Sequence, residues 1–179
     1  SLFFPAAIDQ LFTAAYIVEA AWYFTATDLL GLEHLPLDHM VAALIRVSAL
    51  ERNQKLVSLV VDAGRRGIDC QLDDDAVTVG HGAGSTTWAT DQIPAAIDWA
   101  RLHDIPLALV TGTNGKTTTT RLIAAMGAAT GKISGLSSTE LVSVGGEILD
   151  KGDYSGPAGA RLLLRDSRLQ LGVLEVARG

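Results

Sequence analysis

The sequence has little of several features that mark particular classes of protein. Cys70 is the single cysteine among 179 residues, which excludes an intramolecular disulfide and fits a reducing cytoplasm. The apolar stretch over residues 2–32 contains three acidic residues and no basic one, a pattern that fits neither a signal peptide nor a membrane span. We therefore expect a cytoplasmic protein with no membrane partner.

Basic residues are also scarce, and their distribution is uneven. The formal net charge is −6, with 14 acidic and 6 basic residues over 1–105 and 6 acidic and 8 basic residues over 106–179. No segment combines a basic stripe with interleaved aromatic side chains, so we expect no nucleic-acid partner. The chain also starts at Ser1 without an initiator methionine and stops at Gly179, which leads us to expect a fragment.

The first half of the sequence predicts a mainly helical region. Apolar residues recur at spacings of three and four over residues 6–27, which predicts a helix with one apolar stripe facing a core. Two further helices are expected over residues 37–50 and 52–65. Two short apolar runs flank three consecutive aspartates at positions 73–75, which predicts a hairpin over residues 68–79 with a solvated acidic tip.

A glycine-rich run follows the predicted hairpin. Its pattern departs from the dinucleotide fingerprint G-x-G-x-x-G, because the third glycine position holds Ser85. We therefore interpret residues 80–90 as a flexible connection and residues 94–103 as a short helix. The boundary between a first region, residues 1–104, and a second region, residues 105–179, is placed after this helix.

The most informative segment is PLALVTGTNGKT, which ends at Thr117. A buried strand leads to a turn in which Gly112 and Gly115 can adopt backbone angles closed to other residues, so that N–H groups converge on an anion. The helix that begins near Lys116 directs its unpaired N–H groups and the positive end of its dipole to the same place. We therefore expect a phosphate-binding loop.

The chemistry of this loop indicates a nucleoside triphosphate. Lys116 is expected to reach the β- and γ-phosphates, and the hydroxyl of Thr117 to bind Mg²⁺. The general pattern G-x-x-x-x-G-K-[ST] has glycine where this sequence has Val110, so the loop is a variant.

The remainder of the second half alternates strand and helix patterns. The strands are expected over residues 107–110, 141–144, 147–149 and 169–176, and the helices over residues 116–129 and 158–165. This alternation predicts an α/β fold with a P-loop NTPase-like parallel sheet, preceded by the smaller, mainly helical α+β region.

Further candidate residues lie near the ends of these elements. Glu175 comes at the end of the last strand, and ligands of parallel sheets gather at the carboxyl ends of strands, so Glu175 can meet the phosphate loop and ligate Mg²⁺. The hydroxyl-rich loop at residues 137–140 either completes a magnesium shell or forms an ordinary turn. Arg161 either holds a substrate carboxylate or lies exposed at a helix start.

Two segments resemble a known family. TGTNGKTTT at residues 111–119 resembles the nucleotide loop of the Mur ligase family, whose shortened G-T-x-G-K-T loop accounts for Val110. Residues 135–179, which end in LEVARG, are similar to the corresponding part of the cyanophycin synthetase branch of that family. The sequence departs from relatives at Glu140-Leu141, where Asp-Gly is frequent, and at Val176, where several have threonine.

The resemblance implies a set of site residues. Lys116 and Glu175 would act in catalysis, and a magnesium ion would be held by Thr117 and Glu175, with Thr139 or a neighbouring serine near a second ion. The residues that would bind ATP are Gly112, Thr113, Asn114, Gly115, Lys116, Thr117 and Thr118.

The resemblance also implies a reaction. Family members are ADP-forming ligases that convert a substrate carboxylate to an acyl phosphate with ATP and then join it to an amine, so a small-molecule carboxylate and an amino acid or peptide are the implied partners. Further strands of the central domain and a separate amine-binding domain would follow Gly179 in the family, so we expect this chain alone to be inactive. A kinase- or GTPase-like P-loop protein and a non-catalytic nucleotide-binding module are the alternatives.

Overall fold

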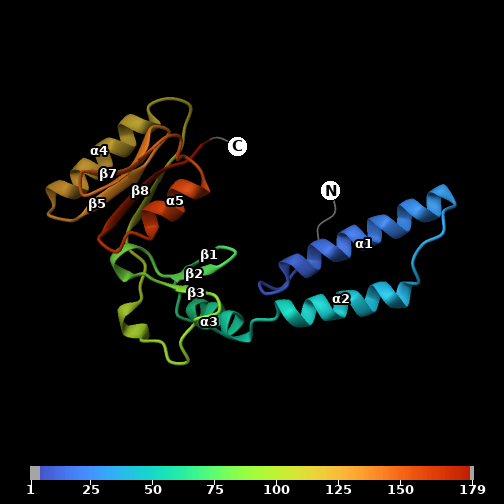
Figure 1. The fold of residues 1–179 in the computed structure, drawn as a ribbon. Coiled ribbons are helices and arrows are strands. Elements are labelled where there is room, and N and C mark those ends of the chain that lie inside the picture. The colour runs from blue at the N-terminus through green and yellow to red at the C-terminus, as the bar shows by residue number, and fades with distance from the viewer. Residues whose placement is uncertain (1–4, 178–179) are drawn as a thin grey trace. The chain divides into compact units, whose positions relative to one another are not determined.

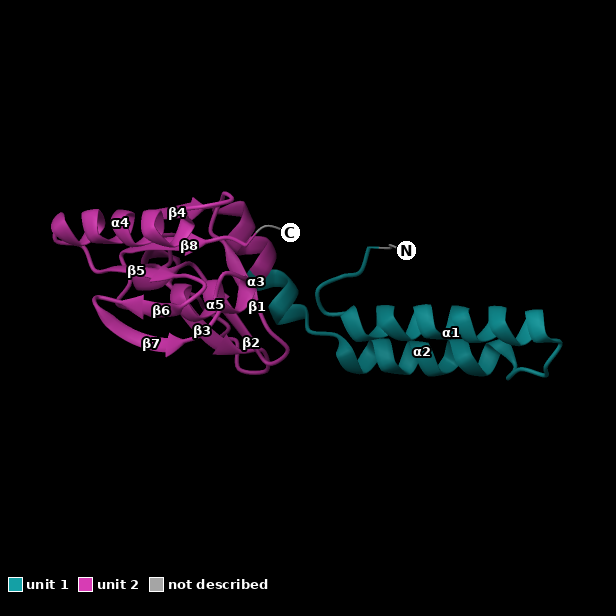
Figure 2. Cartoon of the chain, turned by 90° about the horizontal axis from the view of Figure 1, so that it is seen from above, with its two compact units in different colours: residues 1–59 teal, residues 60–179 magenta. Residues whose placement is uncertain are grey.

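The computed structural model describes residues 5–177, so that Arg178 and Gly179 of the LEVARG motif lie outside the described residues. It divides the chain into two compact units, residues 1–59 and residues 60–179 (Figure 2). The boundary predicted at residue 104 falls inside the second unit and stays a prediction. Among residues 5–177, no helix combines the length and the apolar character that a membrane span requires.

The first unit is a pair of helices. Helix α1 (Leu11–Leu30) ends at Gly31, which adopts a left-handed conformation with φ of 64°, and α2 (Leu37–Glu51) packs against α1 (Figure 1). The side chain of Glu51 caps the start of α1, because its two carboxylate oxygens accept from the N–H groups of Phe12 and Thr13, each at 2.7 Å. The predicted stripe on α1 does not face a core, because its members Leu11 and Phe12 are 59% and 61% exposed.

Helix α3 (Gln54–Arg65) crosses the division between the units. The side chain of Asn53 caps its first turn, since the N–H of Leu56 donates to Oδ1 of Asn53 at 3.0 Å. The three helices therefore begin and end within a few residues of the positions that the sequence predicts.

The second unit opens with a small antiparallel sheet in the order β1-β2-β3. Its strands are β1 (Cys70–Leu72), β2 (Ala76–Val79) and β3 (Thr86–Ala89), and a 3₁₀ turn, η1 (Gly82–Gly84), lies between the last two. A second 3₁₀ turn, η2 (Trp99–Arg101), is the only helical part of the segment where the sequence predicts a helix over residues 94–103.

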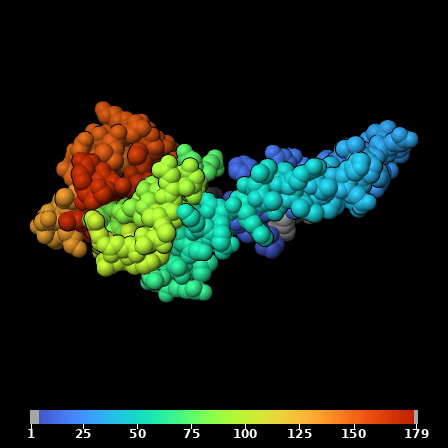
Figure 3. Space-filling view, turned by 60° about the horizontal axis from the view of Figure 1, so that its bottom comes forward, coloured from blue at the N-terminus to red at the C-terminus, as the bar shows by residue number. Residues whose placement is uncertain are grey.

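The prediction of a flexible connection over residues 80–90 is wrong. A Cβ atom added to Gly84 would lie 2.2 Å from the carbonyl oxygen of His103, and one added to Gly82 would lie 2.3 Å from that of Leu169. In Figure 3 the segment after the small sheet, in yellow-green, lies directly against red atoms near the end of the chain. The glycines are therefore needed because two backbones meet here, not because the chain bends freely.

The larger sheet has five strands in the order β4-β8-β5-β6-β7. The outer strand β4 (Leu107–Val110) and β5 (Ser134–Ser137) both run parallel to the central β8 (Leu171–Glu175). Strands β6 (Leu141–Val144) and β7 (Glu147–Lys151) extend the sheet as a hairpin, as the sequence predicts.

Helices cover both faces of this sheet, which gives the second unit a mixed α/β fold (Figure 1). Helix α4 (Lys116–Ala129) packs on β8 and β5 through Ala124, Leu136 and Val173. Helix α5 (Pro157–Leu164) contributes Leu163 and Leu164 to a second cluster, together with Leu174 of β8. Because adjacent residues of a strand point to opposite faces, Val173 and Leu174 serve the two cores in turn.

Strand β5, like β3, is an element that the sequence analysis misses. Serine and glycine are poor strand formers, but Gly135 is required because a Cβ atom there would lie 2.7 Å from the carbonyl oxygen of Ser143. The hydroxyl of Ser134 is buried and donates to the carbonyl oxygen of Ala124 on α4 at 2.7 Å. Tertiary packing, rather than local propensity, determines this strand.

Candidate functional site

The candidate site lies where the three parallel strands of the larger sheet end. In the parallel register, Val110 of β4 is paired with Glu175 of β8, and Ser137 of β5 is paired with Leu174. The carboxyl ends of these strands therefore lie side by side. The segments that follow β4 and β5 meet on either side of Glu175.

The loop after β4 contains two glycines in backbone conformations that other residues rarely adopt. Gly112 and Gly115 have φ angles of 147° and 79°, and Gly115 is the N-cap residue of α4. No side chain caps this helix start, and the first N–H groups of a helix have no partner within the helix. Donor groups and the positive end of the α4 dipole thus lie at the loop.

The predicted ATP-binding residues are consecutive in sequence and span the turn and the first turn of α4. Gly112, Thr113, Asn114 and Gly115 form the turn, and Lys116, Thr117 and Thr118 form the first helical residues. Lys116 is half-buried, and its ammonium group makes no ion pair within residues 5–177. A lysine in this position is available to an anionic ligand.

Three of the predicted residues lie in direct contact. The hydroxyl of Thr117 donates to Oε2 of Glu175 at 2.9 Å, and the N–H of Thr139 approaches the same oxygen at 3.4 Å. The hydroxyls of Thr117 and Thr139 are 3.5 Å apart. Glu175 is only 3% exposed, so this carboxylate is removed from water and held by hydroxyl and amide groups.

This arrangement has the chemistry that suits a hard divalent cation. Mg²⁺ takes oxygen ligands at about 2.1 Å in octahedral geometry, which puts neighbouring ligand oxygens about 3 Å apart. The 2.9 Å between Oγ1 of Thr117 and Oε2 of Glu175 fits that spacing. These two oxygens could therefore hold Mg²⁺ with a modest adjustment, while Thr139 lies within reach of the same position.

The loop after β5 is held in place by its own hydrogen bonds. Ser138 is fully buried, and its Oγ accepts from the N–H groups of Glu140 and Leu141 at 3.2 and 3.3 Å. Glu140 pairs with Arg121 of α4 on the outer side. Of the hydroxyl-rich loop, it is Thr139 that lies beside Thr117 and Glu175, whereas Ser138 stabilises the turn.

A cleft of about 370 Å³ borders Glu175. Its lining includes Ser137 at the end of β5 and Ser155 and Gly156 just before α5. Ser155 is buried, and its carbonyl oxygen accepts from the N–H of Ala177, which joins the segment before α5 to the end of β8. The sequence analysis did not single out Ser155, although it lies in a loop that carries an Asp-Tyr-Ser-Gly-Pro signal.

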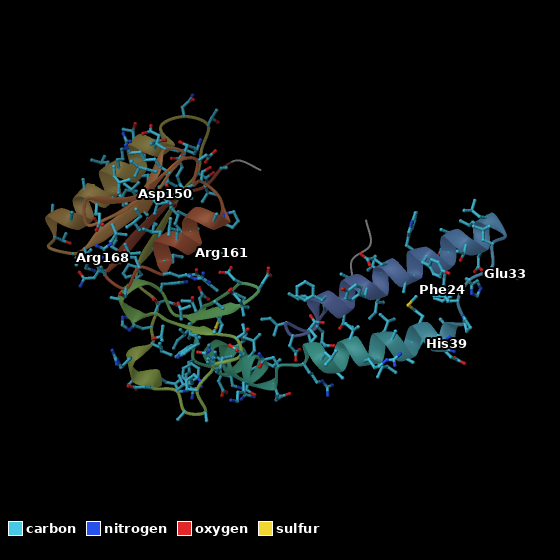
Figure 4. All side chains as sticks on the ribbon, viewed as in Figure 1. Phe24, Glu33, His39, Asp150, Arg161 and Arg168 are labelled. Carbon is cyan, nitrogen blue, oxygen red and sulfur yellow. The ribbon has the colours of Figure 1, made fainter. Side chains whose placement is uncertain are left out.

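Arg161 lies away from these groups. Figure 4 shows Arg161 on α5. Its guanidinium is 3.1 Å from the carboxylate of Asp73, and the guanidinium of Arg165 is 2.5 Å from the same carboxylate. Arg165 also donates to the hydroxyl of Thr78 at 2.9 Å. The two arginines thus connect α5 to the small sheet, and the prediction of a solvated acidic tip is wrong for Asp73.

Comparison with known proteins identifies the same part of the chain. The family model of the Mur ligase middle domain matches residues 110–178. A cyanophycin synthetase from Geminocystis herdmanii is 51% identical over 75 residues, which are 42% of this chain and 9% of that protein. A cyanophycin synthetase from Synechocystis sp. is 49% identical over 75 residues, again 42% of this chain and 9% of the relative. The match thus spans about a tenth of the length of these relatives.

Proposed function

We propose, from the match of residues 110–178 to the Mur ligase middle domain, that this chain is the nucleotide-binding part of an ATP-dependent, ADP-forming amide ligase. The observation that carries the proposal is the contact of Thr117, Glu175 and Thr139 beside the loop at residues 111–117. We propose with it that the larger sheet is P-loop NTPase-like and that this nucleotide-binding region begins near residue 105.

The phosphate loop has the role of binding and orienting ATP. The N–H groups of Asn114 to Thr118 and the ammonium group of Lys116 hold the β- and γ-phosphates, and they stabilise the negative charge that develops between them. Thr117 and Glu175 hold Mg²⁺, with Thr139 as a further oxygen ligand. Magnesium supplies additional neutralisation of the phosphate charge when it is bound.

The proposed reaction has two steps. A substrate carboxylate oxygen forms a bond to the γ-phosphorus while the bond from that phosphorus to ADP breaks, which leaves an acyl phosphate. The amine nitrogen then forms a bond to the carbonyl carbon, phosphate departs, and the nitrogen loses a proton. We assign the carboxylate substrate to the cleft beside Glu175 and Ser155, because Glu175 borders this cleft and also contacts Thr117 of the phosphate loop.

We propose that the 179-residue chain binds Mg·ATP without turning it over, because the matched segment makes up only 9% of the relative's length. Isothermal titration with Mg·ATP tests this, and Lys116→Ala is expected to weaken binding at least about tenfold, since a tenfold change corresponds to about 1.4 kcal/mol. Lys132→Ala is the matched control, because Lys132 is an exposed lysine just beyond the opposite end of α4.

Two outcomes would contradict the proposal. One is an absence of saturable binding of Mg·ATP to the unaltered chain. The other is equal weakening by Lys116→Ala and Lys132→Ala, which would indicate a general charge effect. Formation of ADP that requires both a carboxylate and an amine, measured in a protein that includes this chain, tests the reaction itself.

A further inference from the structure

Three side chains that could bind a metal come together at one corner of the small sheet, away from the phosphate loop. Asp69 precedes β1, His81 follows β2, and Asp104 lies shortly before β4. The antiparallel register pairs Cys70 with Val79, and the N–H of Gly80 donates to the carbonyl oxygen of Asp69 at 2.9 Å. One potential ligand atom from each of the three side chains lies within 4.8 Å of the other two.

Two of these ligand atoms are buried without a hydrogen bond. His81 is 5% exposed, and its Nδ1 lies 3.1 Å from Oδ1 of Asp104. Despite this distance, neither atom makes a hydrogen bond within the described part of the chain. Buried polar atoms in folded proteins nearly always have a hydrogen-bond partner, so a buried nitrogen and oxygen at ion-pair distance without a hydrogen bond are suited to a shared ligand.

The spacing of the two atoms is that of neighbouring ligands on one cation. Bonds of about 2.0 to 2.1 Å from zinc to imidazole nitrogen and carboxylate oxygen put adjacent ligand atoms about 3.0 to 3.4 Å apart. The 3.1 Å between Nδ1 of His81 and Oδ1 of Asp104 lies in this range. The shared position for a cation therefore needs little movement of either side chain.

The surroundings hold these ligands in place. Oδ2 of Asp104 accepts from the N–H of Asp69 at 3.0 Å, which leaves Oδ1 directed to His81. The N–H of His81 donates to the carbonyl oxygen of His103 at 3.2 Å, and Gly80 and Gly84 pack closely against the same backbone. Asp69 is exposed, so its carboxylate can rotate toward the cation and leaves an entry path from solvent.

We propose that Asp69, His81 and Asp104 form a structural site for one divalent transition-metal cation of the zinc type. An imidazole nitrogen with two carboxylates favours such an ion over Mg²⁺, which prefers oxygen ligands alone. The bound cation connects the ends of β1 and β2 to the segment that leads into β4. It thereby stabilises the strand that precedes the phosphate loop, and it takes no part in the chemistry proposed there.

The test is a direct measurement of zinc binding to the tag-free 179-residue chain, by competition with a chromophoric chelator. We expect one Zn²⁺ per chain, and an excess of Mg²⁺ should not displace it. Asp69→Asn is the central variant, because Asp69 is exposed and its replacement preserves the fold. We expect it to weaken zinc affinity at least about tenfold, and His81→Gln to weaken it further.

Two control variants make the assignment specific. His103→Gln replaces an exposed histidine that adjoins Asp104 in sequence, and Cys70→Ser removes the nearby thiol. Both are expected to leave zinc affinity within about twofold of the unaltered chain. A chain that binds no zinc, or one in which His103→Gln weakens binding as much as Asp69→Asn, would overturn the proposal and leave His81 and Asp104 as a plain ion pair.

Discussion

Replacement of Glu175 by glutamine should change the stability of the empty protein little and weaken ligand binding strongly. The substitution preserves volume and an acceptor oxygen for Thr117, so one hydrogen bond can remain. It removes a carboxylate that is 97% buried and has two hydrogen-bond donors within residues 5–177, at 2.9 and 3.4 Å. Burial of such a charge costs several kcal/mol, whereas a hydrogen bond to a charged group contributes about 1.5 to 3 kcal/mol.

In the empty protein, the cost of burying the Glu175 charge and the contribution of its hydrogen bonds nearly cancel. We therefore expect the free energy of unfolding of Glu175→Gln, without ligand, to lie within about 1 kcal/mol of that of the unaltered chain. The effect on ligand binding has no such compensation, because a neutral amide replaces an anionic ligand of Mg²⁺. We expect the affinity for Mg·ATP to fall about a hundredfold, which corresponds to about 2.7 kcal/mol.

The assay is urea denaturation with and without Mg·ATP at one fixed concentration. At a hundred times the dissociation constant, the ligand stabilises the unaltered chain by about 2.7 kcal/mol, and at the same concentration a hundredfold weaker variant gains only about 0.4 kcal/mol. Glu140→Gln is the control, because that exposed carboxylate lies in the same region but pairs with Arg121. Equal stabilisation of both variants by Mg·ATP would refute the role of Glu175 in cation binding.

Three further predictions concern stability and reactivity. Burial raises the pKa of Glu51, but hydrogen bonds from Thr13 and neighbouring N–H groups outweigh it and lower this pKa overall. The stabilisation of α1 by the Glu51 carboxylate is therefore fully present above the ordinary pKa of glutamate and is lost as pH falls through the lowered value. In thermal unfolding, Glu51→Ala should lower the free energy of unfolding by about 1 kcal/mol at pH 7 and leave it unchanged in strong acid. Gly135→Ala should cost about 1 to 3 kcal/mol in urea denaturation, because its Cβ atom would lie 2.7 Å from a backbone oxygen, whereas Gly156→Ala, with nothing within 4 Å, should cost far less. Burial and two nearby carboxylates raise the pKa of Cys70 to about 11. The rate of its alkylation by iodoacetamide should therefore be slow at pH 8 and rise about tenfold per pH unit until the pH reaches this pKa. A rate that levels off near pH 8.5 would contradict this prediction.

Strand β4 and helix α4, on either side of the loop at residues 111–115, could be predicted to the residue. Helix α4 begins at Lys116 and ends at Ala129, as the pattern indicates, because glycine and the Gly-Lys-Thr signature impose a strand, a turn and a helix start locally. The position of Glu175 at a strand end could also be predicted, since an apolar run that ends in one acidic residue is a local feature.

Features that depend on distant packing could not be predicted. Strand β5 contains Gly135 because Ser143 and two leucine side chains leave no space for a Cβ atom, and none of these is adjacent in sequence. The glycines near His81 likewise serve a close approach to His103 and Leu169. A glycine-rich stretch has the same local signal whether it bends freely or packs tightly, so the surroundings decide between the two.

The order of the strands, more than any single residue, determines the candidate site. Strand β8 is the last in sequence but lies between β4 and β5, so its end is inserted between the phosphate loop and Thr139. A shift of one residue in this register would bring Leu174 or Val176 to the position of Glu175, and would also exchange the side chains that face α4 and α5. The two apolar cores therefore hold the carboxylate in register, because Val173 and Leu174 can be buried on their proper faces only when Glu175 meets Thr117.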